Sequence, residues 1–240
     1  MAGSVTGCNS LDYIKVPSPK TQLLLILECI HPMPKPKMTP QSFCFCLLLL
    51  SGSTTSLPAF PGQADLVTSL PGVDFPIAYK QYSGYLELHD HIKFHYWLFE
   101  AQFNSETSPV VQWLNGGPGT SGLFGAFTEL GPLRMNINGT ITPNPYAWNL
   151  KTNLLIIESP VDVGFSYQVN ASAHFTNHDN STAELNFSAL KLFFAKYPHF
   201  LSNDFYITGE SYAGRFIPQL ARLVIKAKFP THFKGTVDDI

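Results

Sequence analysis

The stretch Phe205-Tyr-Ile-Thr-Gly-Glu-Ser-Tyr-Ala-Gly214 decides the fold of this chain. Its first four residues predict a strand, and Arg215–Lys228 predicts a helix behind it, with Pro218 near the first turn. A serine between strand and helix, with small residues two positions before and after it, is typical of a nucleophile elbow. The pattern here is Gly-x-Ser-x-Ala, with Gly214 one residue late. Taken alone, these residues would better fit a serine that caps an ordinary helix.

A second segment, Asn115-Gly-Gly-Pro-Gly119, follows an apolar strand predicted over Val110–Leu114. Glycines let backbone N–H groups approach a ligand closely. In α/β-hydrolases such a loop supplies one N–H donor to a developing oxyanion, and the residue after the nucleophile supplies the other. Here the donors would be Gly117 and Tyr212, although a structural loop without a ligand is the alternative. Together the two segments predict half of a serine hydrolase site around Ser211.

The rest of the chain alternates between strand and helix patterns. The clearest helix starts at a capping box, Ser181-Thr-Ala-Glu184, and is stopped by Pro198. Its apolar residues recur at helical spacing: Ala183, Phe187, Leu190 and Phe194. Further strands are predicted over 82–88, 94–101, 154–157 and 205–208, with His89-Asp-His91 at a turn. This alternation predicts a mostly parallel α/β sheet.

The first 56 residues form a leader of different composition. An apolar run, Phe43–Leu50, is preceded by Lys35 and Lys37 and followed by small residues, which is the order of a secretory signal peptide. Eight residues are too few to span a bilayer, so no stable membrane span is expected. Because the run begins late, we expect translation to start at Met33 or Met38. The alternative is a buried apolar segment of a genuine N-terminal extension.

Cysteine and glycosylation patterns agree with a secreted protein. All four cysteines precede residue 47, so removal of the leader would leave a chain without disulfides. Glycosylation sequons are predicted at Asn138, Asn170 and Asn180, whereas a fourth at Asn186 falls inside the predicted helix.

Charge and metal-ligand patterns exclude some other classes of protein. The formal net charge of −2 gives no basic face for a nucleic acid. No metal or other cofactor is expected, because His89-Asp-His91 lacks a third ligand and fits a solvated hairpin better.

The sequence resembles the serine carboxypeptidase family over roughly residues 70 to 230. The resemblance rests on motifs that occur in the family's order: Tyr82-Ser-Gly-Tyr85, His95-Tyr-Trp97, Trp113–Gly119, Glu129-Leu-Gly-Pro132, Asn144–Asn149, Glu158-Ser-Pro160, Val163–Tyr167 and Gly209–Gly214. It implies an α/β-hydrolase fold over residues 57–240. It also implies a lysosomal or secreted enzyme, active at acidic pH, that removes C-terminal amino acids from peptides through an acyl-enzyme intermediate. A homodimer is a further implication.

The resemblance also implies roles for individual residues. Ser211 would be the nucleophile, and Gly117 with Tyr212 the oxyanion hole. The C-terminal carboxylate of a peptide substrate would be held by Asn115, Glu129 and Glu210, with Trp113 and Gly116 lining the site. Neighbouring carboxyls raise each other's pKa, so protonated glutamates could donate hydrogen bonds to that carboxylate. Each glutamate taken singly would also fit a solvated surface carboxylate.

Several positions depart from the family. Thr120-Ser121-Gly122 replaces Cys-Ser-Ser, which removes a disulfide, and Val161-Asp162 replaces Ala-Gly. Arg215 stands where a small or apolar residue is common, and could reshape the pocket.

The position of Ser211 near the end of the chain is the largest departure. In α/β-hydrolases the acid and histidine of the triad follow the serine, yet only 29 residues follow Ser211. They contain His232, Asp238 and Asp239, and His232 lies too far along the helix to be the base. The remaining histidines are expected at surface or turn positions: His89, His91, His95, His174, His178 and His199.

We therefore expect an α/β-hydrolase domain truncated after the elbow and its helix. The nucleophile would be weakly activated, and the nucleophile strand would be left as an uncovered edge. The alternatives are an inactive homologue that acts as a binding or stabilising protein, and an acyltransferase on the same scaffold.

Overall fold

The computed structural model describes residues 60–169 and 175–239, so the predicted leader and Asn170 lie outside the described residues. Its main feature is a seven-stranded sheet with the order β1-β2-β6-β3-β8-β9, in which β7 also pairs with β2. The strands are β1 (Gln81–Glu87), β2 (Ile92–Phe99), β3 (Val110–Leu114), β6 (Asn153–Ile157), β7 (Tyr167–Gln168), β8 (Phe205–Glu210) and β9 (Phe233–Asp239).

The sheet has a parallel half and an antiparallel half. Strands β6, β3, β8 and β9 run parallel to one another. Strands β1 and β2 form an antiparallel hairpin, and β2 pairs with β6 antiparallel. A parallel core with an antiparallel flank confirms the predicted α/β-hydrolase class, although the sheet is more mixed than the alternating pattern indicated.

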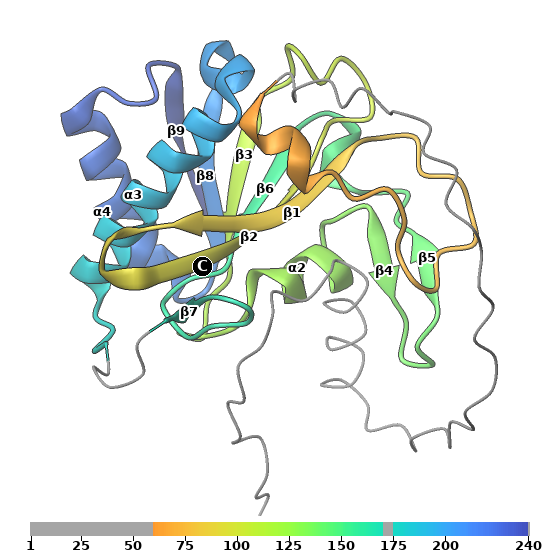
Figure 1. Ribbon diagram of the computed structural model, residues 1–240, viewed down its shortest axis with the longest axis horizontal. Coiled ribbons are helices and arrows are strands. Elements are labelled where there is room, and N and C mark those ends of the chain that lie inside the picture. Colours follow the sequence, from red (N-terminus) through yellow and green to blue (C-terminus); the bar gives the residue numbers. More distant parts are fainter. Residues whose placement is uncertain (1–59, 170–174, 240) are drawn as a thin grey trace, which may run out of the picture.

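Helices cover both faces of the sheet (Figure 1). Helices α3 (Asp179–Lys196) and α4 (Ala213–Ala227) pack on one face, and α2 (Gly122–Thr128) packs on the other. A separate hairpin, β4 (Leu133–Met135) and β5 (Ile141–Pro143), extends from the α2 side. Four 3₁₀ segments complete the described elements: η1 (Pro61–Asp65), η2 (His89–His91), η3 (Trp148–Leu150) and η4 (Pro198–Ser202).

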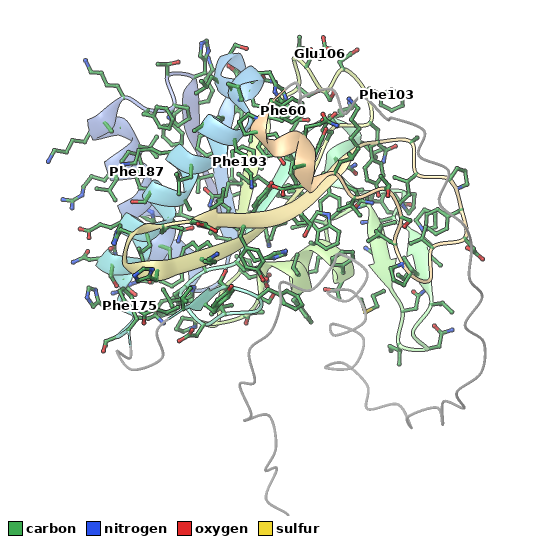
Figure 2. All side chains as sticks on the ribbon, in the orientation of Figure 1. Phe60, Phe103, Glu106, Phe175, Phe187 and Phe193 are labelled. Atoms are coloured by element: carbon green, nitrogen blue, oxygen red, sulfur yellow. The ribbon has the colours of Figure 1, made fainter. Side chains whose placement is uncertain are left out.

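Alternate residues of each central strand enter different cores. Tyr96 and Leu98 of β2 pack under α3 and α4, whereas Trp97 and Phe99 pack against α2. This two-residue period explains why the central strands are apolar on both faces. The larger core is rich in aromatic rings, and Figure 2 labels Phe193 of α3 together with Phe60, the residue before η1, which packs against this core. Both rings contact Tyr197, with centroid distances of 5.5 and 5.0 Å.

The start of α3 differs from the prediction. The helix begins at Asp179 and its N-cap is His178, so Ser181 is the third helical residue and not the cap. The imidazole Nδ1 accepts a hydrogen bond from the Ser181 N–H at 3.2 Å, and the Ser181 hydroxyl receives the His178 N–H at 3.2 Å. An imidazole therefore does the work usually assigned to a hydroxyl or carboxylate, which the residue pattern did not reveal.

The start of α4 was also predicted too late. It begins at Ala213, directly after the elbow, which places Pro218 inside the helix as its sixth residue. Proline has no N–H, so Pro218 cannot donate to the Gly214 carbonyl one turn earlier.

The expectation that the nucleophile strand would be an uncovered edge is wrong. Strand β8 is paired on both sides, with β3 along one edge and β9 along the other. Strand β9 runs parallel to β8 from Phe233 to Asp239, with an irregularity near Tyr206 and Gly235. The segment was missed because Lys234, Gly235 and Thr236 interrupt the apolar pattern of a buried strand.

Candidate active site

Ser211 lies at the sharp turn between β8 and α4. Its backbone has φ = 55°, in the left-handed region that non-glycine residues seldom adopt, and its side chain is exposed. A Cβ atom on Gly209 would lie 2.4 Å from the Leu114 carbonyl oxygen and 2.7 Å from the Ala213 Cβ. The small residues on either side of Ser211 are therefore a steric requirement of the turn.

The glycine loop lies directly against this turn. A Cβ atom on Gly116 would lie 2.8 Å from the Ser211 Cβ and 2.8 Å from the Tyr212 backbone nitrogen. The next residue, Gly117, has φ = 111°, which favours glycine. The structure thus brings the two segments of the predicted oxyanion hole together, from the ends of the adjacent parallel strands β3 and β8.

A chain of short hydrogen bonds runs from β3 to the residue before the nucleophile. The Trp113 indole N–H donates to the Asn115 side-chain oxygen at 2.7 Å, and the Asn115 amide donates to the Glu210 carboxyl at 2.7 Å. Trp113 and Asn115 are buried, whereas Glu210 is partly exposed. The amide of Asn115 is thereby held in one orientation next to a carboxyl group that reaches solvent.

Glu129 completes this group from the end of α2. Burial, and secondarily the charge of Glu210, raises the pKa of the Glu129 carboxyl above its ordinary value. The contribution of Glu210 to this pKa shift means that the two carboxyl groups interact electrostatically. A protonated Glu129 can donate a hydrogen bond to an anion, which an ionised one cannot.

The segment from Asn144 to Trp148 supports Glu129 from behind. The buried Asn144 amide donates to the backbone carbonyls of Glu129 at 3.1 Å and Gly131 at 2.9 Å. The Trp148 ring packs edge-on to Trp113 with a centroid distance of 5.5 Å. The family resemblance identified this segment, but no role could be predicted for it. Contacts between residues 15 positions apart leave no local pattern in the sequence.

A groove of about 680 Å³ opens beside the elbow, between the first turns of α3 and α4. Its lining includes Pro118 and Tyr212. The Tyr212 hydroxyl donates to Asp179 at 3.2 Å, and Arg215 forms an exposed ion pair with the same carboxylate at 3.4 Å. Arg215, the residue that departs from the family, thus shares Asp179 with the tyrosine that follows the nucleophile.

Four histidines lie at exposed turn or helix-end positions, as expected: His89, His91, His178 and His199. His95 was expected at a surface or turn position, and this is wrong, because its side chain is completely buried. His232 lies beside the first residue of β8, because its backbone carbonyl accepts a hydrogen bond from the Phe205 N–H. Ser211 follows the other end of β8, so the two residues are far apart. Among the side chains that the structure describes, those of residues 60–89, 91–169 and 175–237, none forms a hydrogen bond with the Ser211 hydroxyl. His174 lies outside the described residues.

The remaining predicted sites are scattered. Asn138 is exposed in the β4–β5 turn and Asn180 is exposed in the first turn of α3, whereas Asn186 is buried inside α3.

In the described part of the chain, no three His, Cys, Asp or Glu side chains are grouped to hold a metal ion, and no helix has the length and apolar character to cross a bilayer.

Comparisons with known proteins agree with this geometry. Residues 71–237 match the family model described as serine carboxypeptidase. The lysosomal protective protein of Mus musculus is 48% identical over 181 residues, which cover 75% of this chain and 37% of the mouse protein. A serine carboxypeptidase of Caenorhabditis elegans is 44% identical, over 69% of this chain and 29% of the nematode protein.

Among solved structures, a prohormone-processing carboxypeptidase from Saccharomyces cerevisiae matches with a TM-score of 0.59 and 27% identity. The match covers 67% of this chain and 38% of the yeast chain. The chain thus spans about a third of the length of the curated relatives that it matches.

Proposed function

The chain belongs to the serine carboxypeptidase family, and from this premise we propose that it acts on the C-termini of peptides as a serine-type carboxypeptidase. The observation that carries the proposal is the placement of Ser211 beside the hydrogen-bonded pair Asn115 and Glu210, with the Glu129 carboxyl near enough for the Glu210 charge to raise its pKa. A nucleophile next to a site suited to one carboxylate selects the last peptide bond of a chain.

In the proposed reaction, the substrate's terminal carboxylate binds to Asn115, Glu129 and Glu210. The Ser211 oxygen attacks the carbonyl carbon of the last peptide bond, while the N–H groups of Gly117 and Tyr212 stabilise the negative charge on the carbonyl oxygen. The C–N bond breaks, the C-terminal amino acid leaves with a proton, and water then hydrolyses the ester on Ser211. The proton of Ser211 needs a base, which the described residues do not supply.

The two glutamates favour an acidic environment for binding. Three carboxylates at close range would repel one another, and the raised pKa of Glu129 keeps it protonated to a higher pH than an ordinary glutamate. In that form Glu129 donates to the substrate carboxylate and removes one like charge. This behaviour agrees with a lysosomal or secreted location, which we propose together with removal of the leader, residues 1–56, and glycosylation at Asn138, Asn170 and Asn180.

Labelling with a fluorophosphonate serine probe tests the nucleophile. The chain would be secreted from Met38, treated at pH 5 and 7, and compared with Ser211→Ala, with the labelled residue mapped by mass spectrometry. Stoichiometric labelling at Ser211 supports an activated nucleophile. Unlabelled protein that still binds peptides with a free C-terminus would instead be a peptide-binding homologue. Preference for acyl esters over peptides would indicate an acyltransferase.

The same preparation tests the processing. N-terminal sequencing would place the mature terminus near Gly52, and a terminus far upstream of it would contradict the signal peptide. A mass loss on treatment with an N-glycosidase, absent from a variant that combines Asn138→Gln, Asn170→Gln and Asn180→Gln, would assign the glycans.

A further inference from the structure

A buried chain of polar side chains connects the sheet to the glycine loop. It runs from Ser83 on β1 through His95 on β2 and Glu158 after β6 to Ser121 before α2. The Ser83 hydroxyl lies 2.9 Å from the His95 Nε2, and the His95 Nδ1 lies 2.9 Å from the Glu158 carboxylate. The side chains of His95 and Glu158 have no exposed surface.

The Glu158 carboxylate has a donor on each of its oxygens. One oxygen receives the His95 Nδ1–H and the Phe165 backbone N–H, the latter at 2.9 Å, and the other receives the Ser121 hydroxyl. The backbone also closes around it, because a Cβ atom on Gly164, which has φ = 58°, would collide with the carboxylate. A buried charge with a complete set of donors has one defined position, and loss of any donor is costly.

Ser121 joins this carboxylate to the site. Its oxygen accepts the Leu123 N–H at 3.1 Å and so caps α2. The glycine loop enters this cap from one side, and α2 leads to Glu129 at its other end. Close packing leaves α2 little freedom, since a Cβ atom on Gly122 would lie 2.6 Å from Ile156. The position of Ser121 therefore influences both Gly117 and Glu129.

We propose that Glu158, held by His95, is a positioning residue that sets the glycine loop and Glu129 relative to Ser211. Its catalytic consequence rests on the proposed carboxypeptidase function, whereas its effect on the loop does not. The order Ser83, His95, Glu158 has the contacts of a nucleophile, a base and an acid. Ser83 is nevertheless 7% exposed and packed inside the sheet, so a substrate has no access to it.

Amide hydrogen exchange in the full, unliganded chain tests the positioning directly. In Glu158→Gln and in His95→Gln we expect the amides of residues 116–123 to exchange about tenfold faster or more, while those of β3 and α3 change less than about twofold. His95→Gln is informative because the hydrogen bonds of His95 go to Ser83, Ser166 and Glu158, and so reach the glycine loop and α2 only through Glu158. Ser121→Ala should reproduce the effect, and Ser121→Thr should restore protection, because threonine keeps the hydroxyl.

Tyr82→Phe is the matched control. It removes another buried hydrogen bond, from Tyr82 to Glu100 at 3.0 Å, in the core under α3. It should lower overall stability without selective exchange in 116–123. Exchange that rises evenly along the chain in Glu158→Gln and His95→Gln, or unchanged exchange in 116–123, would overturn the proposal. If Glu158→Gln fails to fold, His95→Gln and the two Ser121 variants decide it.

Ligand binding separates this proposal from the proposed function. Wild-type protein should bind an acetylated dipeptide with a free carboxylate at least about tenfold more tightly than its amide, and His95→Gln should reduce that preference. A wild type without preference would contradict the proposed function, and the exchange data would still decide the role of Glu158. A preference kept in full by His95→Gln would show that the network does not position Glu129.

Discussion

The two sides of the candidate site are built very differently. On the carboxylate side, Trp113 and Asn115 are 6% and 5% exposed, and hydrogen bonds of 2.7 Å join them to each other and to Glu210. On the nucleophile side, Ser211 is exposed, and no described side chain forms a hydrogen bond with its hydroxyl. The proposed carboxylate site is thus pre-organised by buried hydrogen bonds, whereas no described side chain is placed to take a proton from the proposed nucleophile.

The difference means that binding and chemistry can be separated by mutation. Substitution of Asn115 should change affinity and stability together, because Asn115 is buried and hydrogen-bonded to both Trp113 and Glu210. Ser211 should affect chemistry alone. Substitutions at the junction of the two sides should disturb both, whereas substitutions on one side should leave the other unchanged.

Gly209→Ala should break the junction itself. The added methyl group would lie 2.4 Å from the Leu114 carbonyl oxygen and 2.7 Å from the Ala213 Cβ, so it would push β3 and α4 apart. We expect a loss of about 3 kcal/mol in the free energy of unfolding, measured by urea denaturation. Gly139→Asn, in the exposed β4–β5 turn at φ = 79°, is the control and should cost less than about 1 kcal/mol. Equal stability of the two variants would contradict the steric reading.

Asn115→Ala should damage the carboxylate side. It leaves the buried Trp113 indole N–H without its acceptor and removes the amide from Glu210, at a cost of about 2 kcal/mol in stability. Affinity for an acetylated dipeptide with a free carboxylate should fall by about tenfold or more. Ser211→Ala should leave that affinity unchanged. If Ser211→Ala weakens binding as much as Asn115→Ala does, the two sides are not separable.

Glu129→Gln should remove a pH dependence. Protonated Glu129 donates to the ligand carboxylate, so binding takes up a proton, and affinity should fall as pH rises through the raised pKa of Glu129. The dissociation constant should increase by up to about tenfold per pH unit in that range, the limit for one proton. In Glu129→Gln, which donates at every pH, calorimetric titration should give a flatter profile. A slope as steep as that of the wild type would exclude Glu129 as the titrating group.

Asp162→Gly should raise stability slightly. Asp162 is exposed at φ = 67°, in the turn that follows Glu158 and Pro160, where the family resemblance has glycine. Glycine adopts this conformation without strain, so we expect a gain of about 0.5 kcal/mol in the free energy of unfolding. Asp162→Ala, which lacks both the freedom of glycine and a polar side chain, should lose stability in the same urea titration. A gain from alanine would point to charge and not to backbone strain.

Residues near one another in sequence were predicted well. The elbow pattern from Phe205 to Gly214 placed a strand, a turn and a helix in the right order, and Val110–Leu114 was predicted to the residue. These predictions succeeded because apolar periodicity and small-residue requirements act over a few positions. The capping of α3 by His178 and the pairing of β9 with β8 were missed, since neither has a strong local signal.

The fold class, the family and the residue types of the candidate site could all be predicted from the amino-acid sequence, because strand, glycine-loop and elbow patterns are local and unusual. Which of these residues lie in contact became clear from the folded structure. It placed Gly116 against Ser211, joined Asn115 to Glu210, and buried His95 with Glu158 across 63 residues of chain. Such contacts depend on the parallel stacking of strands from distant segments, where packing and hydrogen bonding select partners that no short pattern can encode.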